Sequence, residues 1–131
     1  MRTAYEATQW VQINRQELQQ VLINLIVNAV QAMPDGGTLT LTTADRREAD
    51  GRRGVRIAVR DTGAGIQPED MARIFDPFFT TKKTQGTGLG LSISHSLIKR
   101  YGGSITVDSA PGRGAEFVVG LLAEPVYQDE A

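Results

Sequence analysis

The chain has 131 residues, 40% of them hydrophobic and 22% charged, with a formal net charge of −1 and no cysteine. This length and composition predict one domain with a hydrophobic core and exclude an intrinsically disordered chain. The small net charge excludes a global attraction to nucleic acid or membrane, and the absence of cysteine excludes disulfides and thiolate metal sites. No apolar run reaches the roughly 18 residues of a membrane-spanning helix, and we expect no signal peptide.

The first predicted elements are an edge strand or extended arm over residues 3–13 and a helix over residues 14–33. Asn14 is a suitable N-cap, and Glu17 three residues later completes a capping box. The sequence Pro-Asp-Gly-Gly at residues 34–37 ends the helix.

This helix carries one polar stripe on an otherwise apolar surface. At about 100° per residue, five polar side chains fall within one stripe: Glu17, Gln20, Asn24, Asn28 and Gln31. Because nearly every other residue from Leu18 onward is apolar, we expect the helix to be buried around most of its circumference. Buried amides need partners. The stripe therefore binds either other protein groups or a polar ligand, and the helix alone leaves both alternatives open.

The middle of the chain predicts a hairpin, a short helix and a loop. Alternating apolar residues over 38–43 and 55–60 predict two antiparallel strands, joined by a hairpin loop over 44–54. Residues 68–75 begin with proline and predict a short helix. Residues 76–85 have no clean periodicity and predict a mobile loop.

The last third of the chain predicts a helix, a second hairpin and a tail. The helix opens with the glycine motif at 86–90 and ends near residue 101, with a core face formed by Ile93, Leu97, Ile98 and Tyr101. Residues 104–109 and 115–122 predict the hairpin, and residues 124–131 predict a flexible tail.

The order of these elements predicts an α+β fold. We expect a two-layer α/β sandwich in which a mixed, mostly antiparallel sheet is covered on one face by about three helices. Residues 1–131 are expected to form a single domain.

The sequence Asp61-Thr-Gly-Ala-Gly-Ile66 follows directly on a predicted strand. Its glycines allow a sharp turn and the close approach of a flat ligand, and its carboxylate is able to accept a hydrogen bond from the amino group of adenine. Alone, the motif is equally consistent with a simple turn at the end of a strand. A calcium loop is excluded because the regularly spaced oxygen ligands are missing.

The sequence Gly86-Thr-Gly-Leu-Gly90 precedes a predicted helix. Glycine backbone N–H groups and a helix N-terminus are able to bind phosphate oxygens. The motif lacks the Gly-Lys-[Ser/Thr] ending of a P-loop, and it follows a loop rather than a strand, which disfavours a dinucleotide-binding fingerprint.

Together, four segments resemble the conserved boxes of sensor histidine kinases, in family order and with family-like spacing over nearly the whole chain. The N box is residues 24–33 (NLIVNAVQAM), the G1 box 61–66 (DTGAGI), the F box 74–82 (IFDPFFTTK) and the G2 box 86–91 (GTGLGL). The resemblance implies the Bergerat ATP-binding fold of the GHKL superfamily, which includes gyrase, mismatch-repair and chaperone ATPases.

The resemblance also implies roles for individual residues. Asn28 would bind Mg²⁺ through its amide oxygen, Asn24 would lie beside the ATP phosphates, and Asp61 would accept from the adenine amino group. Gln31 stands where many relatives carry a phosphate-contacting lysine, which weakens that contact. The remaining residues implied to contact ATP are Gly63, Gly65, Ile66, Phe75, Thr81, Lys82, Gly86, Thr87, Gly88, Leu89 and Gly90.

Asn24 also bears on the type of reaction. In the hydrolysing relatives, the position four residues before the metal-binding asparagine usually holds a glutamate that activates water, and an amide cannot act as a base. The only histidine, His95, borders the apolar face of its helix and is not followed by an acidic residue, so we expect a surface or packing histidine rather than a phosphorylated one.

The implied function is the catalytic domain of a two-component sensor histidine kinase, which transfers the γ-phosphoryl group of ATP to a histidine on a separate dimerisation domain. A response regulator would then receive the phosphate from that histidine. The domain itself would be cytoplasmic and would contact neither nucleic acid nor the membrane. The alternatives are a nucleotide-binding regulatory module and another GHKL member, either an anti-sigma serine kinase or an ATPase fragment.

Overall fold

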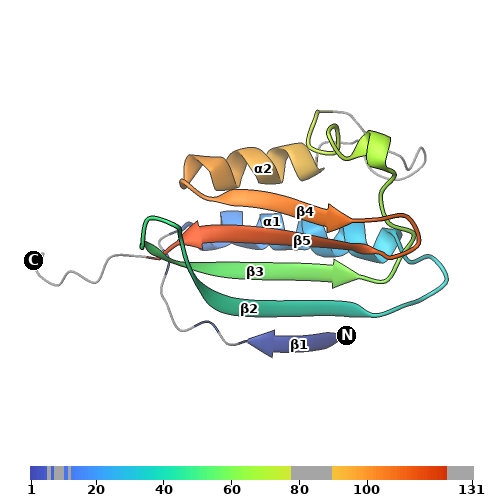
Figure 1. Cartoon of the computed structure of the whole chain (residues 1–131), viewed down its shortest axis with the longest axis horizontal. Coiled ribbons are helices and arrows are strands. Elements are labelled where there is room, and N and C mark those ends of the chain that lie inside the picture. Colours follow the sequence, from blue (N-terminus) through green and yellow to red (C-terminus); the bar gives the residue numbers. More distant parts are fainter. Residues whose placement is uncertain (6, 8–10, 12, 78–89, 124–131) are drawn as a thin grey trace, which may run out of the picture.

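The computed structural model describes residues 1–5, 7, 11, 13–77 and 90–123. Five strands form one sheet in the order β1-β2-β3-β5-β4 (Figure 1). Their bounds are β1 Arg2–Tyr5, β2 Leu39–Arg47, β3 Arg53–Asp61, β4 Ser104–Ser109 and β5 Ala115–Leu122. The edge strand β1 is parallel to β2, and the other neighbours are antiparallel.

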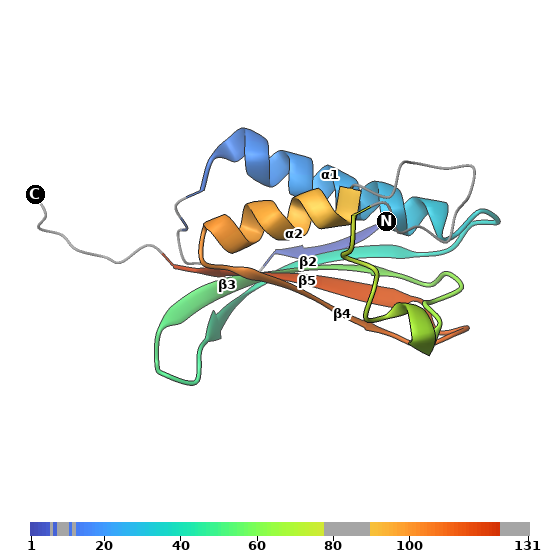
Figure 2. The same ribbon diagram turned by 90° about the horizontal axis from the view of Figure 1, so that it is seen from above.

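Two α-helices, α1 (Arg15–Gln31) and α2 (Gly90–Arg100), lie on the same face of this sheet (Figure 2). The predicted two-layer α+β sandwich with a mixed, mostly antiparallel sheet is therefore confirmed. None of the helices in the described residues is long and apolar enough to cross a membrane.

The first hairpin is longer than predicted. We expected a loop over 44–54, but β2 and β3 stay paired as far as Arg47 and Arg53, and only residues 48–52 turn. Charged side chains near the end of the hairpin find partners at the surface, as Arg46 does with Glu48 at 3.0 Å. Strand pairing depends on the backbone, so a run of exposed charged residues does not end it.

The start of α1 follows the predicted cap only in part. The Asn14 side chain accepts a hydrogen bond from the Glu17 backbone N–H at 3.0 Å, as an N-cap should. The reciprocal half of a capping box is absent, because the Glu17 carboxylate binds Arg100 and Tyr101 at the end of α2 instead.

The expectation that α1 is buried around most of its circumference is wrong. Val21, Leu25 and Ala29 are buried against the sheet, but Ile23, Val27 and Val30 are 54%, 46% and 53% exposed. The sheet covers one side of the helix and α2 covers a second side. No described element covers the outer side that carries these three residues.

Two predictions for the second half of the chain also need correction. The helix predicted over 68–75 is a short 3₁₀ turn, Pro68–Asp70, followed by further hydrogen-bonded turns, because so short a segment gains little from α-helical hydrogen bonds. In α2, Ile98 is buried and Leu97 and Tyr101 pack against the core as predicted, but Ile93 is 46% exposed and Ser94 is the other buried residue. The predicted loop residues 78–85 and the tail 124–131 lie outside the described residues.

Candidate functional site

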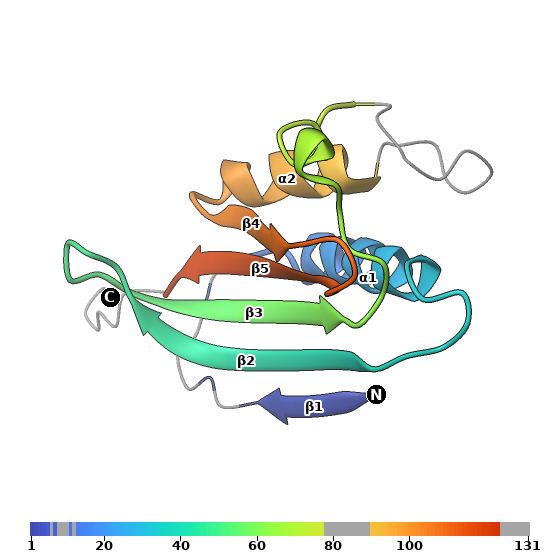
Figure 3. The same ribbon diagram turned by 45° about the vertical axis from the view of Figure 1, so that its right-hand side comes forward.

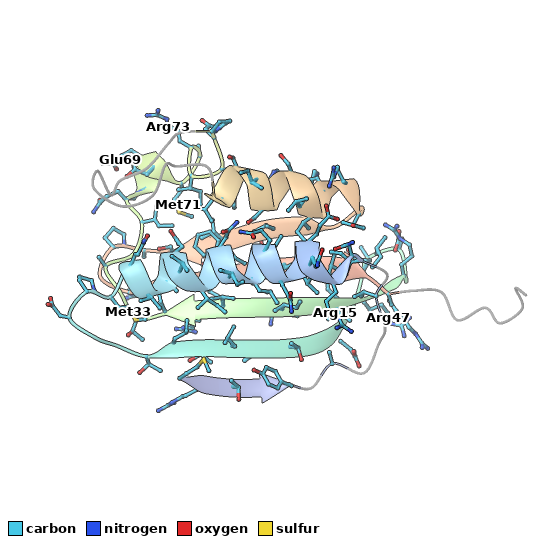
Figure 4. The ribbon with its side chains drawn as sticks, turned by 180° about the vertical axis from the view of Figure 1, so that it is seen from behind. Arg15, Met33, Arg47, Glu69, Met71 and Arg73 are labelled. Atoms are coloured by element: carbon cyan, nitrogen blue, oxygen red, sulfur yellow. The ribbon has the colours of Figure 1, made fainter. Side chains whose placement is uncertain are left out.

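Among the described residues, the G1 loop and the C-terminal end of the N-box helix lie at one end of the two layers. β3 ends here at Asp61, and Figure 3 shows its tip close to the C-terminal end of α1 and to the segment that follows β3. Figure 4 shows Met33 and Met71 at this end and Arg15 at the opposite end of α1. The structure therefore brings the N-box helix and the G1 loop together, as the sequence predicted.

Asp61 is a buried carboxylate at the end of a central strand. It is only 2% exposed, and its neighbours across the sheet are Leu39 on β2 and Ala115 on β5. One carboxylate oxygen, Oδ1, accepts the Gly63 backbone N–H at 2.8 Å, which holds the turn after β3. A carboxylate has acceptor capacity for more than one hydrogen bond, so this arrangement leaves Asp61 able to accept an amino group as well.

The two glycines of the G1 loop let the chain pack tightly against two other elements. A Cβ atom at Gly63 would overlap the carbonyl oxygen of Ala32 at the end of α1, and one at Gly65 would overlap that of Ala110. The loop is also hydrogen-bonded on both sides, from Ala64 N to Ala32 O at 3.4 Å and from Gly112 N to Ala64 O at 2.7 Å. The sequence suggested close approach of a ligand here, and the structure shows close approach of the protein's own backbone.

Ile66 closes this loop. Its backbone N–H donates to the Ser109 hydroxyl at 2.9 Å, and its side chain packs against the hydrophobic core. The loop from Asp61 to Ile66 is thus attached at both ends and in its middle.

The polar stripe of α1 faces α2 over its first half. The Asn24 Nδ2 atom donates to the Ser94 hydroxyl at 3.0 Å and to the Gly90 carbonyl at 3.3 Å, and Asn24 Oδ1 accepts from Gln20 at 3.1 Å. The Glu17 carboxylate also binds α2. Of the two alternatives for the stripe, protein partners or a polar ligand, the structure shows protein partners for Glu17, Gln20 and Asn24. Asn28 and Gln31 are half-buried and lie farther along the helix, towards the G1 loop.

Ser94 binds a predicted site residue, Asn24, and was not itself predicted from the sequence. It is fully buried on α2 and binds Asn24. A signal was available, since Ser94 lies three residues after Leu91 and four before Ile98, in the middle of the apolar face of α2. A serine at the centre of such a face is expected to have a polar partner.

Phe75, which follows the 3₁₀ turn, packs against His95 of α2. Their rings stack with centroids 4.9 Å apart, and Phe75 also meets Phe117 of the core edge-to-face at 6.3 Å. The predicted packing role of His95 is confirmed. The same contacts show that the Phe75 ring rests on the core.

Among the remaining predicted residues, Gly90 begins α2 and contacts Asn24 through its carbonyl oxygen. The others lie outside the described residues, so their predicted ATP contacts stay predictions: Thr81, Lys82, Gly86, Thr87, Gly88 and Leu89.

The chain matches known proteins in both sequence and fold. Residues 13–125 match the family of histidine kinase-, DNA gyrase B-, and HSP90-like ATPases. The sensor histidine kinase ZraS of Escherichia coli O157:H7 is 40% identical over 127 residues, which are 97% of this chain and 26% of that protein. The chain therefore spans about a quarter of the length of this relative.

Two solved structures are similar over nearly the whole chain. The catalytic domain of histidine kinase ThkA superposes with a TM-score of 0.76 at 34% identity, over 95% of this chain and 81% of that one. Full-length ShkA in complex with AMPPNP has the same TM-score of 0.76 at 32% identity, over 96% of this chain and 26% of that one. The chain is thus a member of the histidine kinase-, DNA gyrase B-, and HSP90-like ATPase family, and its relatives are sensor histidine kinases.

Proposed function

We propose that this chain binds ATP and transfers its γ-phosphoryl group to a histidine on a separate dimerisation domain. The observation that carries the proposal is the placement of buried Asp61 and its glycine loop against the C-terminal end of α1, the helix that carries the amide stripe, in a chain of this family. The similar structure of ShkA contains AMPPNP, an ATP analogue, and supports the same kind of ligand here.

Asp61 is proposed to recognise adenine. Its carboxylate already accepts the Gly63 N–H, which fixes the orientation of the side chain, and it retains capacity to accept the adenine amino group. Guanine carries a carbonyl at the corresponding ring position and would place an acceptor against an acceptor. Selectivity for ATP over GTP follows from this difference.

The phosphates are proposed to lie between the C-terminal half of α1 and the N-terminus of α2. Asn28 and Gln31 belong to the half-buried stripe of α1, and backbone N–H groups at the start of α2 favour anionic oxygens. The glycines at 86, 88 and 90, with Thr81, Lys82, Thr87 and Leu89, complete the proposed set.

Magnesium is proposed to be held by the Asn28 amide oxygen together with phosphate oxygens of the nucleotide. Mg²⁺ takes oxygen ligands and is commonly bound by few protein groups plus substrate phosphates, so a single amide oxygen suits it. Within the described part of the chain, no three His, Cys, Asp or Glu side chains gather as a metal site of their own. The ion would neutralise charge on the transferring phosphoryl group.

The site is proposed to serve transfer rather than hydrolysis. An amide cannot deprotonate water, and the Asn24 amide is engaged by Ser94, Gly90 and Gln20. The histidine that accepts the phosphoryl group is proposed to lie on another domain, because His95 is stacked on Phe75. A response regulator receiver domain would be the next acceptor.

The test is a transfer assay with a supplied acceptor domain of a sensor histidine kinase and radiolabelled ATP. We expect acid-labile, base-stable phosphate on the acceptor and none on this chain. Asn28→Ala should abolish the signal, whereas Gln19→Ala, an exposed amide on the same helix, should not. ATP binding without transfer to any acceptor would favour a nucleotide-binding regulatory module instead.

A further inference from the structure

The Asn24 side chain of α1 binds the start of α2 at two points, the Gly90 carbonyl and the Ser94 hydroxyl. We infer that Ser94 is a positioning residue: through Asn24, it holds the start of α2 against α1 and thereby sets the phosphate side of the nucleotide site. The effect of Ser94 on ATP binding rests on the proposed function, whereas the attachment of α2 to α1 does not.

The geometry uses every donor of the Asn24 amide. The two Nδ2 hydrogens serve the Ser94 hydroxyl at 3.0 Å and the Gly90 carbonyl at 3.3 Å. Because a backbone carbonyl only accepts, the NH₂ group must face Gly90 and the amide oxygen must face Gln20, which donates to it at 3.1 Å. The amide is therefore held in one orientation by three partners.

Burial shows why the hydroxyl of Ser94 matters. Ser94 is fully buried beside Ile98, on the face of α2 that packs into the core. A buried hydroxyl is unfavourable unless it is hydrogen-bonded, and alanine would fit the same space. The hydroxyl therefore contributes through its bond to Asn24 rather than through its volume.

The position of this contact along the two helices links it to the phosphates. Gly90 is both the last glycine of the GxGxG motif and the first residue of α2. Asn28 lies about one turn beyond Asn24 on α1. A contact that joins Asn24 to Gly90 and Ser94 therefore sets the separation between the α2 N-terminus and the proposed Mg²⁺ ligand, while Asp61 at the adenine side is attached independently through Gly63.

The contact also requires a hydrogen-bond donor at position 24. A carboxylate there would direct oxygen atoms at the Gly90 carbonyl, which has no proton to give. The amide at position 24 thus serves the docking of α2 as well as excluding a general base.

The experiment compares Ser94→Ala, Asn24→Ala and the double variant, with Ser96→Ala as the matched control on the exposed side of α2. Affinities for Mg·ATP and for adenosine, which lacks phosphates, are measured by calorimetry or NMR titration. Hydrogen exchange is measured on the same samples without nucleotide, at the amides of residues 94–97, which donate to the carbonyls of the first turn of α2.

We expect Ser94→Ala to weaken ATP binding about fivefold, the scale of one neutral hydrogen bond, and to leave adenosine binding unchanged. In the Asn24→Ala background, the same substitution should have no further effect. An ATP affinity equal to that of Ser96→Ala, an equal loss for adenosine, or an undiminished effect in the Asn24→Ala background would each overturn the inference.

The exchange data separate this inference from the proposed function. If the wild-type chain fails to bind ATP, the proposed function fails, but faster exchange in both single variants and no further increase in the double variant would still support the attachment of α2. Unchanged exchange in Ser94→Ala and Asn24→Ala would overturn that attachment whatever the chain binds.

Discussion

The Tyr101 hydroxyl donates a hydrogen bond to the Glu17 carboxylate, and this bond joins the residue after α2 to the first turn of α1. Arg100 adds a second contact to the same carboxylate at 2.9 Å, and the Asn14 N–H donates to the Tyr101 oxygen at 3.4 Å. Together with the Asn24–Ser94 contact, these bonds attach the two helices at two levels. The proposed phosphate contacts of Asn28 and Gln31 lie beyond Asn24, towards the C-terminal end of α1.

This contact predicts an alkaline pH dependence of stability. The hydrogen bond to Glu17 raises the pKa of Tyr101 above its ordinary value of 10.0. Because the protonated hydroxyl is the donor, its stabilisation is complete below about pH 10 and is lost as pH rises through the raised pKa. Tyr101→Phe should therefore lower the Tm at pH 8, and the difference from wild type should shrink above pH 10.

Thermal unfolding of wild type and Tyr101→Phe between pH 8 and pH 11.5 measures this effect. Tyr5→Phe is the control, because Tyr5 is 67% exposed. A Tm difference for Tyr101→Phe that stays constant across this range would contradict the role given to the hydroxyl.

The second prediction concerns adenine recognition. Asp61→Asn should keep the turn after β3, since the asparagine Oδ1 atom is still able to accept the Gly63 N–H. It should weaken ATP binding at least about tenfold, because a hydrogen bond to a charged group contributes about 1.5–3 kcal/mol. Calorimetry gives the affinity and circular dichroism checks the fold; unchanged affinity in a folded variant would remove Asp61 from this role.

The third prediction compares two glycines of the β4–β5 turn. Gly112 and Gly114 have nearly the same positive φ, +77° and +76°, but a Cβ at Gly112 meets nothing within 4 Å, whereas one at Gly114 would overlap the Asp61 carbonyl oxygen. Gly112→Ala should cost about 1–2 kcal/mol of unfolding free energy, the cost of a left-handed alanine. Gly114→Ala should cost about 1–3 kcal/mol more, as overpacking does.

Urea unfolding of the two variants measures this difference directly. Equal free energies of unfolding would show that the turn moves away from Asp61 without cost. That result would mean that the backbone around Asp61 is less constrained than its contacts indicate.

The fourth prediction compares two apolar residues of α1. Leu25 is fully buried and Ile23 is 54% exposed, two positions apart on the same helix. Leu25→Ala should cost about 2–5 kcal/mol of unfolding free energy, as cavities in cores do. Ile23→Ala should cost about 1 kcal/mol or less, as surface substitutions do. A cost as large as that of Leu25→Ala would mean that the outer face of α1 is covered in solution.

The contrast between Ile23 and Leu25 also shows what sequence periodicity is unable to predict. The pattern identified α1 and its polar stripe correctly, because hydrophobic spacing follows helical geometry. It could not show how many sides of the helix other elements cover, since that depends on the width of the layers. The apolar outer face of α1 was therefore wrongly expected to be buried.

The residues of the candidate site likewise divide into those with a local sequence pattern and those whose contacts depend on tertiary packing. Asp61, the glycines at 63 and 65, and the amide stripe are identified as candidates from sequence because each motif has a distinctive residue pattern. The place of Ser94 on the apolar face of α2 indicates that it needs a polar partner, but the identity of that partner, Asn24, 70 positions away, depends on tertiary packing. The contacts of the G1 glycines with Ala32 and Ala110 likewise depend on tertiary packing and leave no local pattern.

A calorimetric titration of the chain with ATP, with and without Mg²⁺, beside a parallel titration with GTP, tests the proposed nucleotide site. We expect ATP binding that Mg²⁺ strengthens and GTP binding at least about tenfold weaker, the scale of one lost hydrogen bond to a charged group. Equal binding of ATP and GTP, or no binding of ATP in the presence of Mg²⁺, would contradict the proposed site.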